Sequence, residues 1–213
     1  MKLQIAVDIA DTYRILEIAS QIHDVIDIYE VGTPVIMKEG MFPVKMLKKA
    51  FPNLCVLADT KIMDGGSIEC QDVCDAGADI VTVLALADDE TIREVVEIAH
   101  KNGKQVMADM IREPRIQERA KQLLTFGVDL IGVHTGVDMQ KQGRTPLQDL
   151  ATLVESIPSS YVTVAGGVNM NSIDEYVALH PEVIIAGGSL YNSQDIRRAV
   201  IEMKGHLDYD STK

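Results

Sequence analysis

Eight short apolar segments alternate with longer amphipathic segments along the whole of this 213-residue chain. The apolar segments are rich in Val and Ile and mostly lack polar alternation, which is typical of strands buried on both faces. They lie at residues 3–8, 26–31, 54–59, 79–84, 105–109, 129–134, 161–165 and 183–186. No Pro-, Gly- or Ser-rich linker separates them, so we expect one domain over residues 1–213, with a polar tail from about residue 207 that frays.

The intervals carry helical patterns, clearest at 88–101, 113–126 and 193–207. In the first of these, Ile92, Val95, Val96 and Ala99 form one apolar stripe among charged residues. Strands and helices that alternate in this way predict an α/β fold, a (β/α)8 TIM barrel. The structural alternative is a doubly wound open sheet. That fold would normally place a GxGxxG turn after the first strand, where this chain has residues 8–11, Asp-Ile-Ala-Asp.

The composition excludes some classes of binding partner and some cellular settings. The formal net charge is −12 and no basic patch stands out, which argues against nucleic acid and anionic membranes as partners. No apolar run approaches the roughly 20 residues that span a bilayer. The chain start is charged too early for a signal peptide. Three cysteines without a CxxC pair indicate a reducing, cytoplasmic setting.

Three charged residues stand at the end of the third apolar segment, in the spacing Asp59-x-Lys61-x-x-Asp64. Because charge is costly to bury, this placement calls for a functional reason. Side chains alternate along a strand, so Asp59 and Lys61 are expected on the same side. Asp64 lies beyond the strand and can fold back beside them. A lysine flanked by carboxylates suits proton transfer, metal binding or both.

Other polar residues end further strands, and in a (β/α)8 barrel these ends form the active site. Asp8, Glu30 and Asp109 are the acidic ones, and Glu30, Asp59 and Asp109 together would suit a hard cation such as Mg²⁺. His134 ends the sixth strand, where it could transfer a proton, orient a substrate or make a structural hydrogen bond.

Two glycine pairs follow the last two strands: Gly166 with Gly167, and Gly187 with Gly188. Glycine allows a ligand to approach the backbone closely, and the loops after strands 7 and 8 are the common phosphate site of such barrels. The alternative is that these glycines only form tight turns.

Together the Asp59-x-Lys61-x-x-Asp64 motif, Asp8, the strand end at 30–33 (Glu-Val-Gly-Thr) and the glycine pairs resemble the orotidine monophosphate decarboxylase suprafamily. Within it, the chain is most similar to the 3-hexulose-6-phosphate synthases. The segments at 58–66, 77–84 and 133–138 carry the likeness most closely, and it covers nearly the whole chain.

This resemblance implies an aldehyde-lyase that condenses formaldehyde with D-ribulose 5-phosphate, a sugar phosphate, through an enediolate stabilised by Mg²⁺ or Mn²⁺. It implies metal ligation by Glu30 and Asp59, and phosphate binding by the glycine pairs. Lys61 would place positive charge beside the enediolate, and either His134 or Lys61 would be the base. It further implies a homodimer with shared active sites, in which Asp64 reaches the neighbouring subunit's site.

The nearest rival within the suprafamily is 3-keto-L-gulonate-6-phosphate decarboxylase. That family has arginines where this chain has Val137 and Gly188, and it typically has Glu where this chain has Asp109. Each departure favours the synthase. A third reading is a barrel that binds a sugar phosphate without turnover. The intact set of charged residues at the strand ends argues against that reading.

Overall fold

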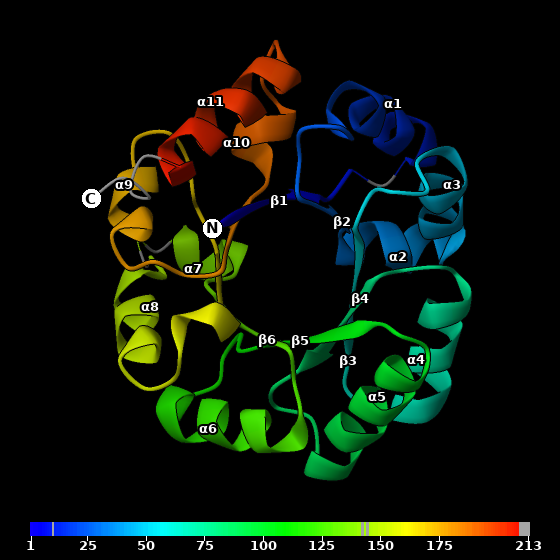
Figure 1. Cartoon of the computed structure of the whole chain (residues 1–213), viewed down its shortest axis with the longest axis vertical. Helices are drawn as coiled ribbons and strands as arrows, with labels where there is room; N and C mark the ends of the chain where they lie inside the picture. The colour runs from blue at the N-terminus through cyan, green and yellow to red at the C-terminus, as the bar shows by residue number, and fades with distance from the viewer. Residues whose placement is uncertain (10, 142, 144, 209–213) are drawn as a thin grey trace.

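Eight parallel strands pair in sequence order, and β8 pairs with β1 to close the sheet into a barrel. This is the arrangement of the computed structural model, which describes residues 1–9, 11–141, 143 and 145–208. Figure 1 shows the helices arranged as a ring outside the strands. The predicted (β/α)8 barrel is confirmed, and the open-sheet alternative is wrong.

The strands lie close to their predicted positions. They are β1 Lys2–Val7, β2 Ile28–Val31, β3 Val56–Ile62, β4 Ile80–Leu84, β5 Gln105–Asp109, β6 Leu130–His134, β7 Val162–Ala165 and β8 Val183–Ala186. The largest difference is in β3, which continues past the predicted end at residue 59. Asp59 and Lys61 therefore belong to the strand itself.

The helices are α1 Thr12–Ile22, α2 Thr33–Glu39, α3 Phe42–Ala50, α4 Gly66–Asp75, α5 Asp89–Lys101, α6 Ile116–Phe126, α7 Val137–Gln140, α8 Leu147–Val154, α9 Ile173–Val177, α10 Gly188–Tyr191 and α11 Ile196–Asp208, with a 3-10 turn at Ser159–Tyr161. Along the described residues, none of them is long and apolar enough to cross a membrane. The predicted fraying of the tail concerns residues 209–213, which lie outside the described part.

Two helices begin later than the sequence predicted. Before α6, Pro114 disfavours a helical conformation at Glu113, whose carboxylate instead accepts a hydrogen bond from the Arg115 N–H at 2.8 Å. Before α11, the carboxylate of Asp195 accepts from the N–H of Arg198 at 2.9 Å, which is the geometry of an N-cap. In both places, a local hydrogen bond accepted by a side chain determines where the helix begins.

The barrel interior is layered, and this layering positions the site. An apolar layer near the amino ends of the strands includes Ile28, Leu57, Ile80 and Met107. Because strand side chains alternate, the next inward position on each of these strands lies two residues farther on. Those positions hold Glu30, Asp59, Thr82 and Asp109, all of them buried. The polar layer therefore rests on an apolar floor.

Candidate active site

A cavity of about 610 Å³ lies at the carboxyl ends of the strands. Its wall contains all the predicted site residues except Asp64: Asp8, Glu30, Asp59, Lys61, Asp109, His134, Gly166, Gly167, Gly187 and Gly188. Five of the six polar side chains come from β2, β3, β5 and β6, Asp8 directly follows β1, and the glycines follow β7 and β8. The fold thus brings residues from the whole length of the chain to one opening.

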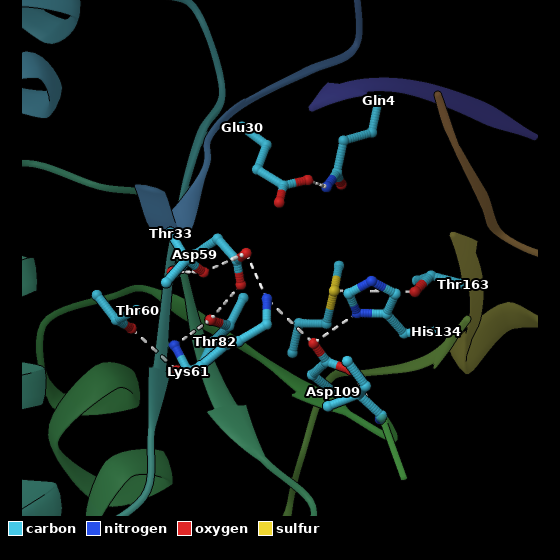
Figure 2. A network of polar contacts seen from close by, with 12 residues as sticks. Gln4, Glu30, Thr33, Asp59, Thr60, Lys61, Thr82, Asp109, His134 and Thr163 are labelled. Carbon is cyan, nitrogen blue, oxygen red and sulfur yellow. Dashed lines mark hydrogen bonds and ion pairs between the residues drawn. The ribbon is translucent and has the colours of Figure 1, made fainter. Parts of the chain in front are cut away.

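Lys61 lies between two carboxylates, as Figure 2 shows. Its Nζ is 2.5 Å from Asp59 Oδ2 and 3.2 Å from Asp109 Oδ2, which confirms that Asp59 and Lys61 face the same side. Burial alone would lower the pKa of Lys61, but the two carboxylates outweigh it and the net pKa is raised. Lys61 is therefore a fixed positive charge in the site.

Asp109 joins Lys61 to His134. Its Oδ2 is 2.9 Å from His134 Nδ1, and its Oδ1 accepts from the Ile111 N–H at 2.8 Å. Burial raises the pKa of Asp109, but the hydrogen bond from His134 and the charge of Lys61 lower it more. An ionised carboxylate only accepts hydrogen bonds, so Nδ1 of His134 carries the hydrogen. The lone pair is then on Nε2, on the ring edge away from Asp109 (Figure 2).

Glu30 is buried beside Gln4. The amide nitrogen of Gln4 donates to Glu30 Oε2 at 2.5 Å, and the amide oxygen Oε1 of Gln4 is buried without a hydrogen-bond partner. Burial, and then the charge of Asp59, raises the pKa of Glu30 well above its ordinary value. A positive charge beside Glu30 would relieve both the repulsion between the carboxylates and the cost of burial.

Asp59 is held by hydrogen bonds on both oxygens. Thr33 donates to Oδ2 at 2.8 Å, and Thr82 donates to Oδ1 at 3.1 Å. These threonines, like Gln4, were not predicted from the sequence. A signal for Gln4 existed, because it shares a strand face with Asp8 in the otherwise apolar first strand.

The donor set fits a hard divalent cation. Glu30 and Asp59 supply carboxylate oxygens to one cavity, and Gln4, whose buried amide oxygen has no hydrogen-bond partner, also lines it. The described residues contain no cluster of three or more His, Cys, Asp or Glu side chains in position to bind a metal. Mg²⁺ is often bound by one or two carboxylates and keeps its other ligands as waters or substrate oxygens. Two carboxylates in one cavity are therefore compatible with Mg²⁺ as a ligand set.

Asp8 stands at the rim of the cavity, next to Gly32. The residue is exposed on one side, but burial of its carboxyl group, and then the charge of Asp59, raises its pKa. A Cβ at position 32 would lie 2.0 Å from Asp8 Oδ1, so only glycine leaves room for this carboxylate. This close contact explains why the predicted strand end at 30–33 has glycine at position 32.

The backbone conformation after β7 requires glycine at positions 166 and 167. Gly166 has φ +118° and Gly167 has φ +75°, which other residues rarely adopt. A Cβ on Gly166 would also lie 2.6 Å from the carbonyl oxygen of Thr135. These glycines therefore form a tight turn, and the same turn is part of the cavity wall.

Asp64 is placed differently from the other predicted residues. It is exposed, and its Oδ1 accepts a hydrogen bond from the N–H of Gly65 at 2.8 Å. The expectation that it folds back beside Asp59 and Lys61 of its own chain is not met. Val137, at the start of α7, has a side chain outside the described part.

The chain is similar to proteins of one family over nearly its whole length. The profile of the orotidine 5'-phosphate decarboxylase / HUMPS family matches residues 1–203. A 3-hexulose-6-phosphate synthase from Staphylococcus aureus is 42% identical over 208 residues, 98% of this chain and 99% of that one. One from Bacillus subtilis is 39% identical over 204 residues, with 96% and 97% covered. The crystal structure of 3-hexulose-6-phosphate synthase from Salmonella typhimurium superposes with a TM-score of 0.93, at 38% identity and 97% and 98% coverage.

Proposed function

Because the chain belongs to the orotidine 5'-phosphate decarboxylase / HUMPS family, we propose that it catalyses the reaction of its 3-hexulose-6-phosphate synthase relatives. The reaction is the aldol condensation of formaldehyde with D-ribulose 5-phosphate. The observation that carries this proposal is the continuous chain of contacts from Asp59 through Lys61 and Asp109 to His134 inside the cavity. That chain provides both a base and a fixed cation for enolate chemistry.

His134 is the base in this mechanism. Its Nε2 removes a proton from the carbon next to the substrate ketone, and an enediolate forms. Asp109 fixes the ring by its 2.9 Å contact to Nδ1 and stabilises the imidazolium that results. The enediolate carbon then forms a bond to the carbon of formaldehyde, whose oxygen takes up a proton. The imidazolium of His134 can return that proton, which restores the starting state.

Lys61 stabilises negative charge on the enediolate. The carboxylates of Asp59 and Asp109 raise its pKa, so the ammonium stays protonated and is a poor proton acceptor. Of the two candidate bases, this favours His134. Asp8, at the rim of the same cavity, contributes a further carboxyl group beside the ammonium.

Glu30 and Asp59 would hold Mg²⁺ or Mn²⁺. When bound, such a cation supplies Lewis-acid stabilisation of negative charge on the substrate oxygens. Glu30 is kept in place by Gln4, and Asp59 by Thr33 and Thr82.

The phosphate group would bind at the glycine pairs. Gly166 and Gly167 line the same cavity as Gly187 and Gly188, on the side of β7 and β8. Without side chains, these positions leave backbone N–H groups accessible to an anion. Anchoring the phosphate there holds the reactive end of the sugar near His134 and Lys61.

Two subunits would share their sites. Large apolar side chains are exposed on β3's neighbouring elements and on the loop that carries Asp64: Met37, Phe42, Met63, Ile68 and Leu86. They come from α2, α3, α4 and the loops after β3 and β4, which are neighbours around the barrel. A second copy packed on this face would cover them and bring each Asp64 to the partner's cavity. Inactive Lys61→Ala and Asp64→Ala variants should regain activity when mixed, because one site in each mixed dimer is intact.

We also propose that the enzyme acts in the cytoplasm. The three free cysteines, Cys55, Cys70 and Cys74, support a reducing compartment.

The test of the proposed function is formaldehyde consumption with ribulose 5-phosphate and Mg²⁺. A parallel reaction contains 3-keto-L-gulonate 6-phosphate, the substrate of the rival decarboxylase. We expect formaldehyde loss that needs both the sugar phosphate and the metal and that stops with EDTA. Gly188, where the decarboxylase has arginine, supports this outcome. Efficient CO₂ release without formaldehyde loss would overturn the proposal.

A further inference from the structure

The backbone of β3 is strained at Lys61. This residue has φ +48°, in the left-handed region that residues other than glycine rarely adopt. The pairing of β3 with β4 also shifts register between Ala58 and Ile62, so the strand bulges at the point where Asp59 and Lys61 lie. Such a conformation persists only when neighbouring groups hold it.

The group that holds the bulge is Thr82 of β4. Its hydroxyl oxygen accepts the N–H of Lys61 at 2.8 Å, and the same hydroxyl donates to Asp59 Oδ1 at 3.1 Å. The carbonyl of Thr82 accepts from the Thr60 hydroxyl at 3.0 Å. Thr82 is only 2% exposed, and it lines the cavity. Figure 2 shows these three contacts converging on one residue.

We propose that Thr82 is a positioning residue that sets both the conformation of Lys61 and the orientation of Asp59. The inference rests on the proposed function, in which Lys61 is the cation beside the enediolate and Asp59 a metal ligand. Thr82 acts through these two residues.

The chemistry of a hydroxyl is what this position requires. One atom must accept a hydrogen bond from the strand backbone and donate one to a carboxylate, which a hydroxyl can do at once. Valine has the same shape but neither function, whereas serine keeps both. The Oδ2 atom of Asp59 already accepts from Lys61 and Thr33, so Thr82 fixes the remaining oxygen. Without it, the carboxylate can rotate, and the Lys61 N–H is left without its acceptor.

The experiment compares Thr82→Val and Thr82→Ser with the matched control Thr163→Val. Thr163 is also a fully buried barrel threonine, but its hydroxyl contacts only the sulfur of Met107, at 3.8 Å, among the contacts described. Three quantities are measured: the Mn²⁺ affinity without substrate, by electron paramagnetic resonance; the hydrogen exchange of the segment 59–62; and kcat with KM.

We expect Thr82→Val to lower kcat by about tenfold to a hundredfold, since small displacements in an active site cost this much. Mn²⁺ binding should weaken and exchange in the segment 59–62 should become faster. KM for the sugar phosphate should change little, because the glycine pairs are untouched. Thr82→Ser should restore all three quantities, and Thr163→Val should leave them at wild-type values.

Wild-type metal affinity and exchange in Thr82→Val would overturn the inference, as would equal losses in Thr163→Val. Metal affinity and exchange do not require turnover. If the protein consumed no formaldehyde, the proposed function would fail while these two measurements still decided the role of Thr82.

Discussion

Replacing Asp109 by Asn tests the assignment of His134 as the base. Asp109 accepts hydrogen bonds from the Nδ1 of His134, the N–H of Ile111 and, at 3.2 Å, the ammonium of Lys61. Asparagine keeps the shape but has one acceptor oxygen and one NH₂ donor. Because Oδ2 of Asp109 faces both Nδ1 of His134 and the ammonium of Lys61, the NH₂ group of asparagine must face either these two groups or the N–H of Ile111. In the first orientation, the imidazole must carry its hydrogen on Nε2, the atom that should receive the substrate proton. In the second, two N–H donors face each other and the imidazolium that forms has no negatively charged partner.

The size of the effect follows from the loss of a correctly held base. A positioned general base contributes roughly 10² to 10⁴ in rate. An Asp-to-Asn change in a Ser-His-Asp triad, which reverses a histidine tautomer, costs about 10⁴, the upper end of this range. We therefore expect kcat of Asp109→Asn to fall by about 10² to 10⁴, with the fold intact because the side-chain volume is unchanged.

The assay isolates the proton-transfer step. Ribulose 5-phosphate is incubated with enzyme in D₂O without formaldehyde, and the loss of the proton signal next to the ketone is followed by NMR. The control is Asp129→Asn. Asp129 also contacts a histidine at 2.9 Å, His100, and accepts a backbone N–H at 2.8 Å from Val106, but it does not line the active-site cavity. We expect exchange to fall in Asp109→Asn and to stay normal in Asp129→Asn.

Two results would refute this reasoning. Exchange at the wild-type rate in Asp109→Asn would show that the Asp109–His134 pair does not deliver the base. An equal fall in Asp129→Asn would show that the effect comes from general destabilisation of the barrel.

The remaining predictions concern the metal, the rim and the stability of the barrel. Glu30→Gln should weaken Mn²⁺ binding by about tenfold or more. It should also raise the melting temperature in EDTA, because a buried carboxylate is replaced by a neutral amide. Calorimetry with and without metal measures the binding and the melting temperature. Gly32→Ala should displace the carboxylate of Asp8, destabilise the fold by about 1–3 kcal/mol and lower kcat; a normal kcat would contradict the steric reading. Asp79→Asn should cost about 1–3 kcal/mol at pH 7 in urea unfolding. Burial raises the pKa of Asp79, but its lysine and backbone partners lower it more. The contribution of the Asp79 carboxylate to stability is therefore complete above its unfolded pKa of about 3.9. It is lost as the pH falls through the lowered folded pKa, so mutant and wild type should converge at acidic pH.

The periodicity of the sequence was enough to predict the barrel and most of the site. Strand ends are fixed by apolar runs, and parallel strands in a closed barrel must end at the same rim. Residues far apart in the chain, such as Glu30 and His134, were therefore predicted to meet, and both line the cavity. The reasoning needed only the fold and the position of each residue on its strand.

The local geometry of β3 could not be predicted in this way. A regular strand would place Asp59 and Lys61 on one side without strain, and nothing in the sequence signals the left-handed conformation of Lys61. The bulge depends on Thr82, a residue on the next strand, so it is a tertiary effect. The prediction that Asp64 folds back beside Lys61 of its own chain was wrong for a related reason. After the bulge, the chain leads to exposed positions.

The amino ends of the strands show a different use of carboxylates. Asp27, Asp79 and Asp129 directly precede β2, β4 and β6, and each accepts a backbone N–H at the start of the preceding strand, at 2.8, 2.9 and 2.8 Å. Each also contacts a basic side chain. Before β8 the corresponding residue is Glu182, which forms an ion pair with Lys2 at 2.9 Å. These carboxylates join strands in pairs and stabilise the barrel.

Carboxylate side chains therefore have opposite effects on stability at the two ends of the barrel. At the amino ends, each aspartate has a backbone N–H donor and a basic side chain as partners. At the carboxyl ends, burial and then the charge of Asp59 raise the pKa values of Asp8 and Glu30, and the ammonium of Lys61 is shared between Asp59 and Asp109. Such crowding opposes folding unless further positive charge enters the site. Under the proposed function, the excess negative charge would favour binding of a divalent cation at this end of the barrel, and that cation together with Lys61 would stabilise the negative charge that develops in the reaction.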